Sequence, residues 1–243
     1  MIFMVMHKLT PEIEQGMPPD RALIDAMGQL VGEAIAQGKF LNGAGLKKTS
    51  ERVRLRCKDG QCEITRGPLE GKNELLAGFA QLHVKSMDEA IEWTRRIAAA
   101  EGGEVEFDIG PVVERWDLGL VPKPTNVDLP LNALAVRKAD AASERGDRPS
   151  AQASARMQAL LGEMKQAGVL TAVEGLKPSS RGARLRAKGG KNTWTDGPFA
   201  ESKEMISGFT ILKVDSLAEA KTWTDRYADI LGDIEVDVCE VEA

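Results

Sequence analysis

The sequence predicts an α+β protein made of two ferredoxin-like domains, each with the element order β-α-β-β-α-β. Two observations support this fold class: the chain repeats itself, and each repeat alternates strand-like and helix-like segments. Residues 38–97 align without a gap with residues 168–227, an offset of 130 (168 − 38), and 24 of these 60 positions are identical. The repeat is longer than a solenoid unit of roughly 20–50 residues, so each copy is long enough to be a domain.

The first strand and first helix of each copy follow from apolar spacing. Residues 1–8 contain a run of six apolar residues, which suits a buried strand but is too short for a membrane span or a signal-peptide core. Helical spacing over residues 23–34 and 153–164 predicts a helix in each copy, with Gly38 and Gly168 as C-caps. Each copy therefore opens with a strand and a helix.

The second half of each copy begins with a hairpin. Residues 53–65 read as two short strands around Asp59-Gly60, and residues 76–85 as a longer strand. The motif Ser-x-x-Glu, at Ser86 and again at Ser216, is a capping box that opens the second helix. The last strands are predicted at residues 105–113 and 234–241.

A proline-containing connection separates the copies. Pro122 and Pro124 favour an extended segment, and we place the boundary near residues 117–128, with domains at 1–116 and 129–243. Helices on one face of an antiparallel sheet leave its other face bare. We therefore expect the two copies to cover each other sheet to sheet, as an intramolecular pseudo-dimer that can also dimerise further.

Composition excludes several classes of function. A net charge of −5 argues against nucleic acid as a partner, because phosphate neutralisation needs a basic surface. No phosphate-loop, Gly-x-Ser-x-Gly or His-Glu-x-x-His pattern occurs, so we expect no cofactor and no metal. The odd number of cysteines suits a reducing compartment, and we expect a cytoplasmic protein without membrane contact.

Two of the cysteines face each other across the predicted hairpin. Cys57 and Cys62 flank its turn, and the second copy carries Ala187 and Asn192 at these positions. The simplest interpretation is two half-buried free thiols. A disulfide is the alternative if the strand geometry permits it.

The segment Asp196-Gly197-Pro198-Phe199, followed by Gly208-Phe209, resembles the YCII-related family in the branch named for its DGPF motif. The resemblance covers nearly all of both copies. In the first copy Arg66 and Leu69 replace the aspartate and phenylalanine of the motif. The resemblance implies a dimeric α/β barrel, in agreement with the element order.

The resemblance also implies a histidine in the first helix, eleven residues before its terminal glycine, acting with an aspartate as an acid/base pair. Met27 and Met157 occupy these positions. A thioether cannot transfer protons, so this chemistry is not expected here. The first hypothesis is a small-molecule-binding or accessory protein, and the family's links to alternative sigma factors and stress responses imply a regulatory role. The alternatives are a lyase- or isomerase-type enzyme acting on a small anionic compound, and a purely structural interaction domain.

Asp196 and Glu204 are the candidate catalytic carboxylates. Asp196 precedes Gly-Pro, so it either bonds its own turn or lines the family pocket. Glu204 follows Lys203, and the two form either a solvated charge pair or part of a site.

A basic cluster is the candidate ligand site. His7 and His83 lie near the ends of the first and third strands of the first copy, which we expect to be parallel neighbours. Arg137 and Lys213 are their equivalents in the second copy. These four residues predict a pocket for a small anionic ligand at that end of the sheet in each copy. The pocket of the first copy alone would be pH-sensitive, because it contains histidine. The alternative is four unrelated surface residues.

Overall fold

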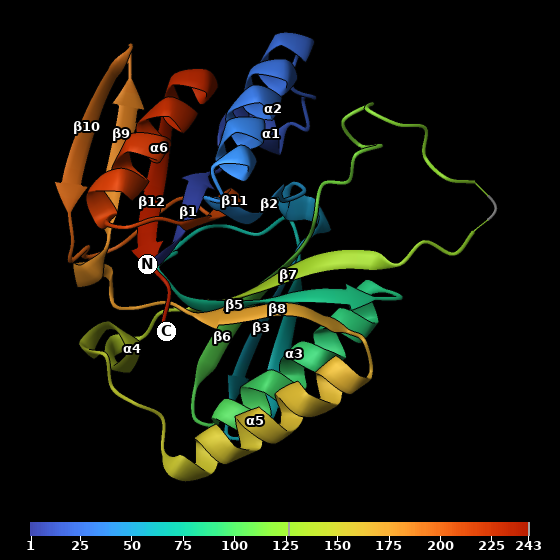
Figure 1. The fold of residues 1–243 in the computed structure, drawn as a ribbon. Coiled ribbons are helices and arrows are strands. Elements are labelled where there is room, and N and C mark those ends of the chain that lie inside the picture. Colours follow the sequence, from blue (N-terminus) through green and yellow to red (C-terminus); the bar gives the residue numbers. More distant parts are fainter. Residues whose placement is uncertain (126, 243) are drawn as a thin grey trace. The chain divides into compact units, whose positions relative to one another are not determined.

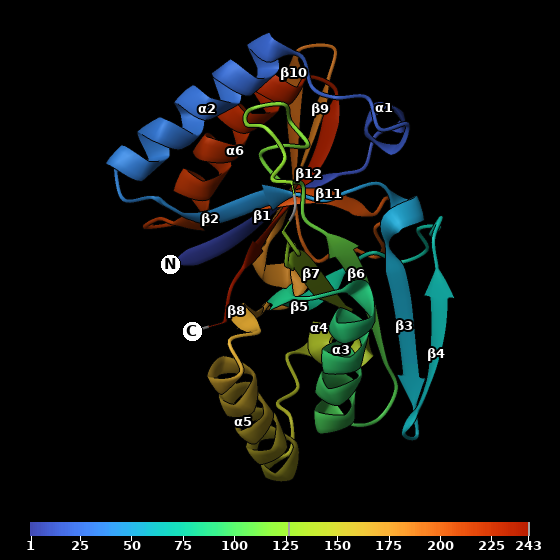
Figure 2. The same cartoon turned by 90° about the vertical axis from the view of Figure 1, so that its right-hand side faces the viewer.

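The computed structural model describes residues 1–125 and 127–242, and these residues form two compact units (Figures 1 and 2). Unit 1 contains residues 1–45, 72–74 and 176–242, and unit 2 contains residues 46–71 and 75–175. Each unit therefore takes its opening strand, helix and strand from one sequence copy and the remainder from the other. The copies at 1–116 and 129–243 are repeats of sequence, whereas the compact units cross the boundary between them.

Unit 1 holds a six-stranded antiparallel sheet in the order β10-β9-β12-β1-β11-β2. Its strands are β1 (Ile2–Lys8), β2 (Phe40–Gly45), β9 (Ala183–Lys188), β10 (Lys191–Asp196), β11 (Ile206–Lys213) and β12 (Ile234–Glu240). Its helices are α1 (Pro11–Glu14), α2 (Arg21–Ala36) and α6 (Leu217–Leu231), with a 3₁₀ turn η2 (Ser179–Arg181). Helices α2 and α6 lie alongside each other on one face of the sheet (Figure 1).

Unit 2 repeats this plan with the strand order β4-β3-β6-β7-β5-β8. Its strands are β3 (Val53–Lys58), β4 (Gln61–Arg66), β5 (Leu76–Val84), β6 (Val105–Pro111), β7 (Leu131–Lys138) and β8 (Leu170–Gly175). Its helices are α3 (Met87–Glu101), α4 (Ala141–Arg145) and α5 (Ala151–Gln166), with a 3₁₀ turn η1 (Thr49–Glu51). Helices α3 and α5 lie side by side on one sheet face (Figure 2).

Both units are thus of the mixed α+β kind that the sequence predicts, and consistent with the ferredoxin-like plan. The four strands β12-β1-β11-β2 make up that plan in unit 1, and the β9–β10 hairpin extends the sheet beside β12. The sequence does not predict β2 and β8. Residues 40–45 read Phe-Leu-Asn-Gly-Ala-Gly, and glycine and asparagine are depleted in strands. These segments become strands because an edge of the sheet is open to them.

The predicted helix ends are confirmed. Asp20 caps α2 by accepting a hydrogen bond from the Leu23 amide, and Gly38 follows the helix at a φ of +65°. Ser86 caps α3 and Ser216 caps α6, each accepting from the amide of the glutamate three residues on. Gly38 adopts the left-handed conformation that disfavours a β carbon.

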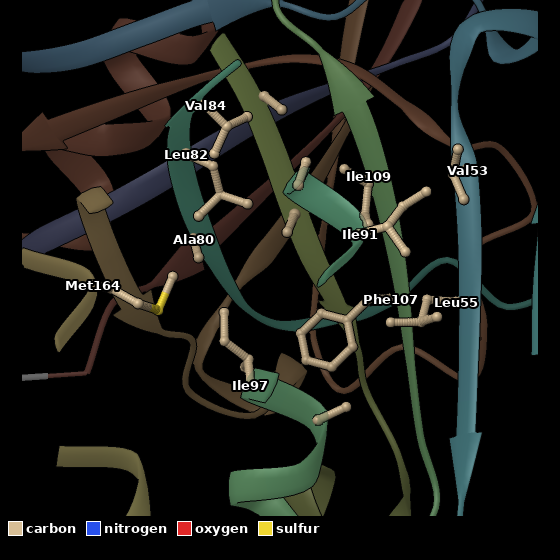
Figure 3. Packing of buried hydrophobic residues seen from close by; sticks show 14 of the residues in the cluster. Val53, Leu55, Ala80, Leu82, Val84, Ile91, Ile97, Phe107, Ile109 and Met164 are labelled. Carbon is tan, nitrogen blue, oxygen red and sulfur yellow. The ribbon is translucent and has the colours of Figure 1, made fainter. Parts of the chain in front are cut away.

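The core of unit 2 shows how the two sequence copies combine. Met164 of α5 comes from the second copy, yet it packs in one cluster with Ala80, Leu82, Ile97 and Phe107 of the first copy (Figure 3). Most of these side chains alternate along their strands, so one face of the sheet is apolar toward α3 and α5. Burial of this shared face holds the exchanged segments in one unit.

Cys57 and Cys62 form a disulfide, which corrects the expectation of free thiols. The two residues pair directly across β3 and β4, with their Cα atoms 4.1 Å apart. The Asp59-Gly60 turn fixes this register, so each sulfur faces the other across the hairpin. Cys239 is a buried free thiol.

Candidate functional site

An open pocket lies in each unit where the end of the hairpin meets the start of a long helix. In unit 2 its volume is about 550 Å³, and we call it the unit 2 hairpin pocket. The residues that set its charge are five cations and two carboxylates: Lys47, Arg52, Arg66, Lys85, Lys123, Glu51 and Glu114. Trp116, at the end of the first sequence copy, adds a half-buried aromatic side chain to the lining of the pocket.

The unit 1 hairpin pocket has a volume of about 420 Å³ and occupies the corresponding place. Equivalent residues of the repeat line both pockets: Ser50 and Ser180, Arg66 and Asp196, Met87 and Leu217. Its charged residues are balanced, with two cations and two carboxylates: Arg181, Lys221, Asp196 and Glu240. The same pocket is therefore cationic in unit 2 and balanced in unit 1.

A Gly-Pro step directly follows Arg66 and Asp196, the equivalent lining residues of the two pockets. A β carbon on Gly67 would lie 1.9 Å from the Thr49 carbonyl oxygen, and one on Gly197 would lie 1.8 Å from that of Ser179. No side chain fits at such distances, so only glycine lets the end of the hairpin approach the preceding 3₁₀ turn. This close approach explains why the Gly-Pro pair recurs when the residue before it changes.

The residue before each Gly-Pro step forms an exposed ion pair. Asp196 Oδ1 accepts a hydrogen bond from Lys221 Nζ at 2.6 Å, and Lys221 lies over the ring of Trp194. Arg66 Nη2 donates to Asp88 Oδ1 at 2.7 Å. Asp196 therefore lines a pocket, as the functional hypothesis for this residue requires. Its catalytic role stays a hypothesis.

Each unit also contains a buried charge cluster on the sheet face away from the helices. In unit 1, Lys8 Nζ lies 2.7 Å from Asp237, and Arg184 donates to both oxygens of Asp237 at 2.6 and 3.0 Å. In unit 2, Lys138 Nζ lies 2.8 Å from Asp108, whose oxygens accept from Arg54 at 2.7 and 2.8 Å. The recurrence of one lysine, one aspartate and one arginine indicates a role in the fold.

The two cluster aspartates differ in acidity. Burial opposes ionisation of Asp237, but Lys8 and Arg184 outweigh it and hold its pKa below the ordinary value. Burial raises the pKa of Asp108, in spite of the hydrogen bonds from Arg54. Because the lysine and the arginine of each cluster are already paired with the buried aspartate, neither cation is readily available to a ligand.

A second pocket of unit 1, with a volume of about 650 Å³, opens beside the unit 1 cluster. Lys8 and Arg184 line it, and Glu204 lies on its wall with Glu12. Asp196 and Glu204, the two candidate carboxylates, therefore line different pockets of unit 1.

His7 and His83 lie on strands of different units. His7 is on β1 of unit 1 and His83 on β5 of unit 2. The expected parallel pairing is wrong for two reasons: all neighbouring strands are antiparallel, and the copies exchange segments, so β1 pairs with β11 and β12. His7 lies opposite Gly208, with Nδ1 2.7 Å from the hydroxyl oxygen of Tyr227.

Arg137 and Lys213 also lie on strands of different units, β7 and β11. Arg137 Nε donates to Glu101 at 2.5 Å and Nη2 donates to Asp140 at 2.9 Å, so protein carboxylates already neutralise it. Lys213 is exposed at the end of β11, opposite Ile2. A role of these four residues in ligand binding stays a prediction.

Sequence reasoning missed most of the unit 2 hairpin pocket. Arg52, Lys85 and Lys123 come from segments far apart in the chain. Comparison of the copies offers one signal, since Arg52 and Lys85 replace Gly182 and Asp215. Trp116 has no partner in the aligned repeat, and its place in a pocket follows only from the path of the connecting segment.

Among the described residues, no group of three or more histidine, cysteine, aspartate or glutamate side chains could hold a metal ion. No helix in the described part of the chain is long and apolar enough to cross a membrane.

The fold and its pockets define a class: a duplicated α+β protein with two antiparallel six-stranded sheets and an open pocket beside each hairpin. The model of the YCII-related domain matches residues 1–111 and 133–237, so the chain belongs to the YCII-related family. A similar curated protein is the uncharacterized protein R00369 of Rhizobium meliloti (strain 1021), 44% identical over 55 residues. That alignment covers 23% of this chain and 44% of the relative, less than half of its length. No solved structure matches.

Proposed function

We propose that this protein is a small-molecule-binding or accessory protein of the DGPF branch of the YCII-related family, without histidine-based acid/base chemistry. The observation that carries the proposal is the packing of Met27 and Met157, at the positions where the family resemblance implies a histidine. Each is half-buried and packs against the helix-side core of its unit, Met27 in unit 1 and Met157 in unit 2. Neither thioether can accept or donate the proton that catalysis by the implied histidine would need.

The unit 2 hairpin pocket supports a binding role. Its volume of about 550 Å³ lies within the range of roughly 300–1,000 Å³ typical of small-molecule sites. Cations outnumber carboxylates in its lining, which suits an anionic ligand. The regulatory or stress-linked role that the family resemblance implies would follow if such a ligand changes the protein's interactions.

A ligand screen tests this proposal. The full chain is scanned by thermal unfolding against small anionic metabolites, because a ligand at 100 times its Kd stabilises the native state by about 2.7 kcal/mol. Each stabilising compound is then incubated with the protein and followed by NMR. We expect at least one compound to raise Tm and to stay chemically unchanged. Failure of every compound to raise Tm contradicts a binding role.

The alternative is a lyase- or isomerase-type enzyme acting on a small anionic compound, and one arrangement in unit 2 favours it. Glu114 lines the hairpin pocket, and its Oε1 accepts from Asn132 Nδ2 at 2.7 Å. Asn132 Oδ1 in turn lies 2.8 Å from His83 Nδ1. A carboxylate oriented in this way, in a cationic pocket, can act as a general base. Conversion of a bound compound by the native chain, lost in Glu114→Gln with binding retained, would establish this alternative.

The proposal also includes a cytoplasmic location, no nucleic-acid partner, and association of the units as an intramolecular dimeric α/β barrel. Antiparallel sheets with helices on one face support the barrel, and a net charge of −5 supports the absence of a nucleic-acid partner. The cytoplasmic location rests on the odd number of cysteines, and the Cys57–Cys62 disulfide counts against it, because disulfides are rare in the cytosol. Light scattering and small-angle X-ray scattering of the purified chain test the barrel and any homodimer of the chain. Retention of DNA at physiological salt would contradict the absence of a nucleic-acid partner.

A further inference from the structure

The two hairpin pockets are the same place in the fold with different chemistry. In unit 2 the lining has five cations and two carboxylates, whereas in unit 1 it has two of each. The difference arises at equivalent positions, where Arg66 stands in place of Asp196 and Arg52 in place of Gly182. Comparison with unit 1 therefore shows which lining residues the fold requires and which are particular to the unit 2 hairpin pocket.

The cations that line the unit 2 hairpin pocket differ in whether other groups of the protein already bind them. Arg52 is buried, and its Nε donates to the Lys47 carbonyl oxygen at 2.6 Å, so it is fixed in the pocket wall. Lys47 pairs with Asp117 at 3.1 Å. Lys85 and Lys123 are exposed and form no ion pair within the described part of the chain.

Arg66 can also change partners at small cost. In its ion pair with Asp88 the two side chains are 60% and 81% exposed. Such surface pairs contribute only about 0–1 kcal/mol, so an anion in the pocket can replace Asp88 as the partner of Arg66. Arg66, Lys85 and Lys123 are thus the side chains available to an anionic group.

Trp116 adds a second kind of contact. It is half-buried within a turn, where the Gly119 amide donates to its carbonyl oxygen at 3.1 Å. The neighbouring Asp117 accepts from the Glu114 amide and pairs with Lys47, which fastens the turn to the pocket. The indole of Trp116 in the pocket lining offers a planar surface on which an aromatic ring can stack. The unit 1 hairpin pocket has no tryptophan among its lining residues.

We infer that the unit 2 hairpin pocket binds a small compound made of an aromatic ring and an anionic phosphate or carboxylate group. The anion lies with Arg66 and Lys85, and the ring lies against Trp116. This inference rests on the proposed binding function and adds to it the site and the class of ligand. The unit 1 hairpin pocket does not take this ligand, because Asp196 would face the anion.

The test uses the full chain and calorimetric titration with four probes: phenyl phosphate, benzoate, inorganic phosphate and phenol. We expect phenyl phosphate or benzoate to bind at least about tenfold more tightly than inorganic phosphate or phenol, because only the first two offer both contacts. The order of phenyl phosphate and benzoate distinguishes a phosphate from a carboxylate ligand. Equal binding of inorganic phosphate and both aromatic anions would overturn the role of the ring.

Three variants locate the site. Arg66→Asp introduces the unit 1 residue at this position. It should lower the affinity for the aromatic anions about tenfold or more, which is the effect expected from the loss of a hydrogen bond to a charged group. Trp116→Ala should remove the advantage of phenyl phosphate over inorganic phosphate. The matched control is Arg181→Ala, which removes an exposed cation of the unit 1 hairpin pocket and should leave the affinity for all four probes unchanged.

The outcomes separate the inference from the proposed function. Unchanged affinity in Arg66→Asp, or an equal loss in Arg181→Ala, overturns the pocket assignment while binding by the protein stands. A chain that binds none of the four probes but is stabilised by another anion overturns the aromatic ligand class alone. Absence of any stabilising anion contradicts the binding function itself.

Discussion

Units 1 and 2 share their sheet order and their buried lysine–aspartate–arginine cluster, yet their hairpin pockets differ in charge. The clusters agree in geometry, with lysine–aspartate distances of 2.7 and 2.8 Å. The pockets differ where Asp196 of unit 1 is replaced by Arg66 of unit 2. The buried clusters, which stabilise each sheet, are the same in both units. The residues that differ here line the pockets, where a ligand can reach them.

The difference extends to the strands beside each pocket. Unit 2 crosslinks its hairpin through Cys57 and Cys62, whereas in unit 1 Asn192 reaches across to Asp225 at 3.0 Å. The hairpin is therefore fixed in both units, by a covalent bond in one and by hydrogen bonding to α6 in the other. Equivalent positions meet the same structural need with different chemistry.

The largest expected effect comes from breaking a buried cluster. Asp237→Ala leaves Lys8 and Arg184 buried without their shared carboxylate, and we expect a loss of about 3–5 kcal/mol in the free energy of unfolding. Asp108→Ala in unit 2 should cost a similar amount, because Lys138 and Arg54 lose the same partner. Urea denaturation of the full chain measures both losses.

The control for this experiment is Asp88→Ala, which removes an exposed partner of Arg66 and should cost within about 1 kcal/mol. A loss of stability in Asp237→Ala without a matching loss in Asp108→Ala would show that the two clusters do not contribute equally to stability. A small loss at both positions would mean that the clusters are not structural.

The next effect concerns the close approach of the hairpin to its 3₁₀ turn. Gly197→Ala places a β carbon 1.8 Å from the Ser179 carbonyl oxygen, and Gly67→Ala places one 1.9 Å from that of Thr49. We expect each to destabilise by the upper end of the roughly 1–3 kcal/mol of an overpacked site. Thermal unfolding of each variant measures this loss.

The control is Gly162→Ala in α5, where a β carbon meets nothing within 4 Å. This change should raise stability by about 0.5–1 kcal/mol, because alanine favours the helix over glycine. Stability unchanged in Gly67→Ala but lowered in Gly197→Ala would limit the constraint to unit 1.

The elements were predictable from local sequence, but their pairing was not. Apolar spacing, the Ser86 and Ser216 caps and the Asp59-Gly60 turn act over a few residues and identify helices and hairpins in the chain. Nothing local decides whether residues 2–8 pair with the first copy or the second, since the duplicated strands are similar partners. The exchange of segments is therefore visible only in the structure.

The candidate site illustrates the same limit. Asp196 was identified from its motif and does line a pocket, because Gly-Pro fixes the backbone beside it. The expected parallel pairing of the strands that carry His7 and His83 is wrong, because β1 pairs with β11 and β12 and β5 pairs with β7 and β8. Arg52, Trp116 and Lys123 meet only through long-range packing, which spacing along the sequence cannot predict.

A smaller effect should follow from the disulfide, which occurs in unit 2 only. Thiol titration of the unfolded, unreduced protein should find one free thiol, Cys239, and three after reduction. Reduction should lower stability by about 2 kcal/mol, as expected for a short crosslinked loop. The variant Cys57→Ala with Cys62→Asn copies the unit 1 residues and should be insensitive to reductant. Three reactive thiols before reduction would contradict the crosslink.

The smallest effect separates the two clusters by pH. Lys8 and Arg184 hold the pKa of Asp237 below the ordinary value of 3.8 in spite of burial, so the folded state favours the carboxylate. The stability it provides is present above the unfolded pKa and is lost as pH falls through the lower, folded pKa. Burial raises the pKa of Asp108, so this carboxyl affects stability in the opposite direction. Its contribution to folding is fully present below the unfolded pKa and is lost as pH rises through the higher, folded pKa.

Conservative variants test this difference through the change of Tm with pH, and not through Tm at a single pH. In Asp237→Asn, the fall in Tm between about pH 5 and pH 2 should be shallower than in the native chain, because one acid-sensitive group is gone. In Asp108→Asn the same fall should be steeper, since a group that favours folding on protonation is gone. Each slope is compared within one variant across pH, so a constant loss of stability from the asparagine cancels. Equal slopes in both variants would show that Lys138 holds Asp108 ionised as firmly as Lys8 holds Asp237, and the clusters would then match in charge as well as in geometry.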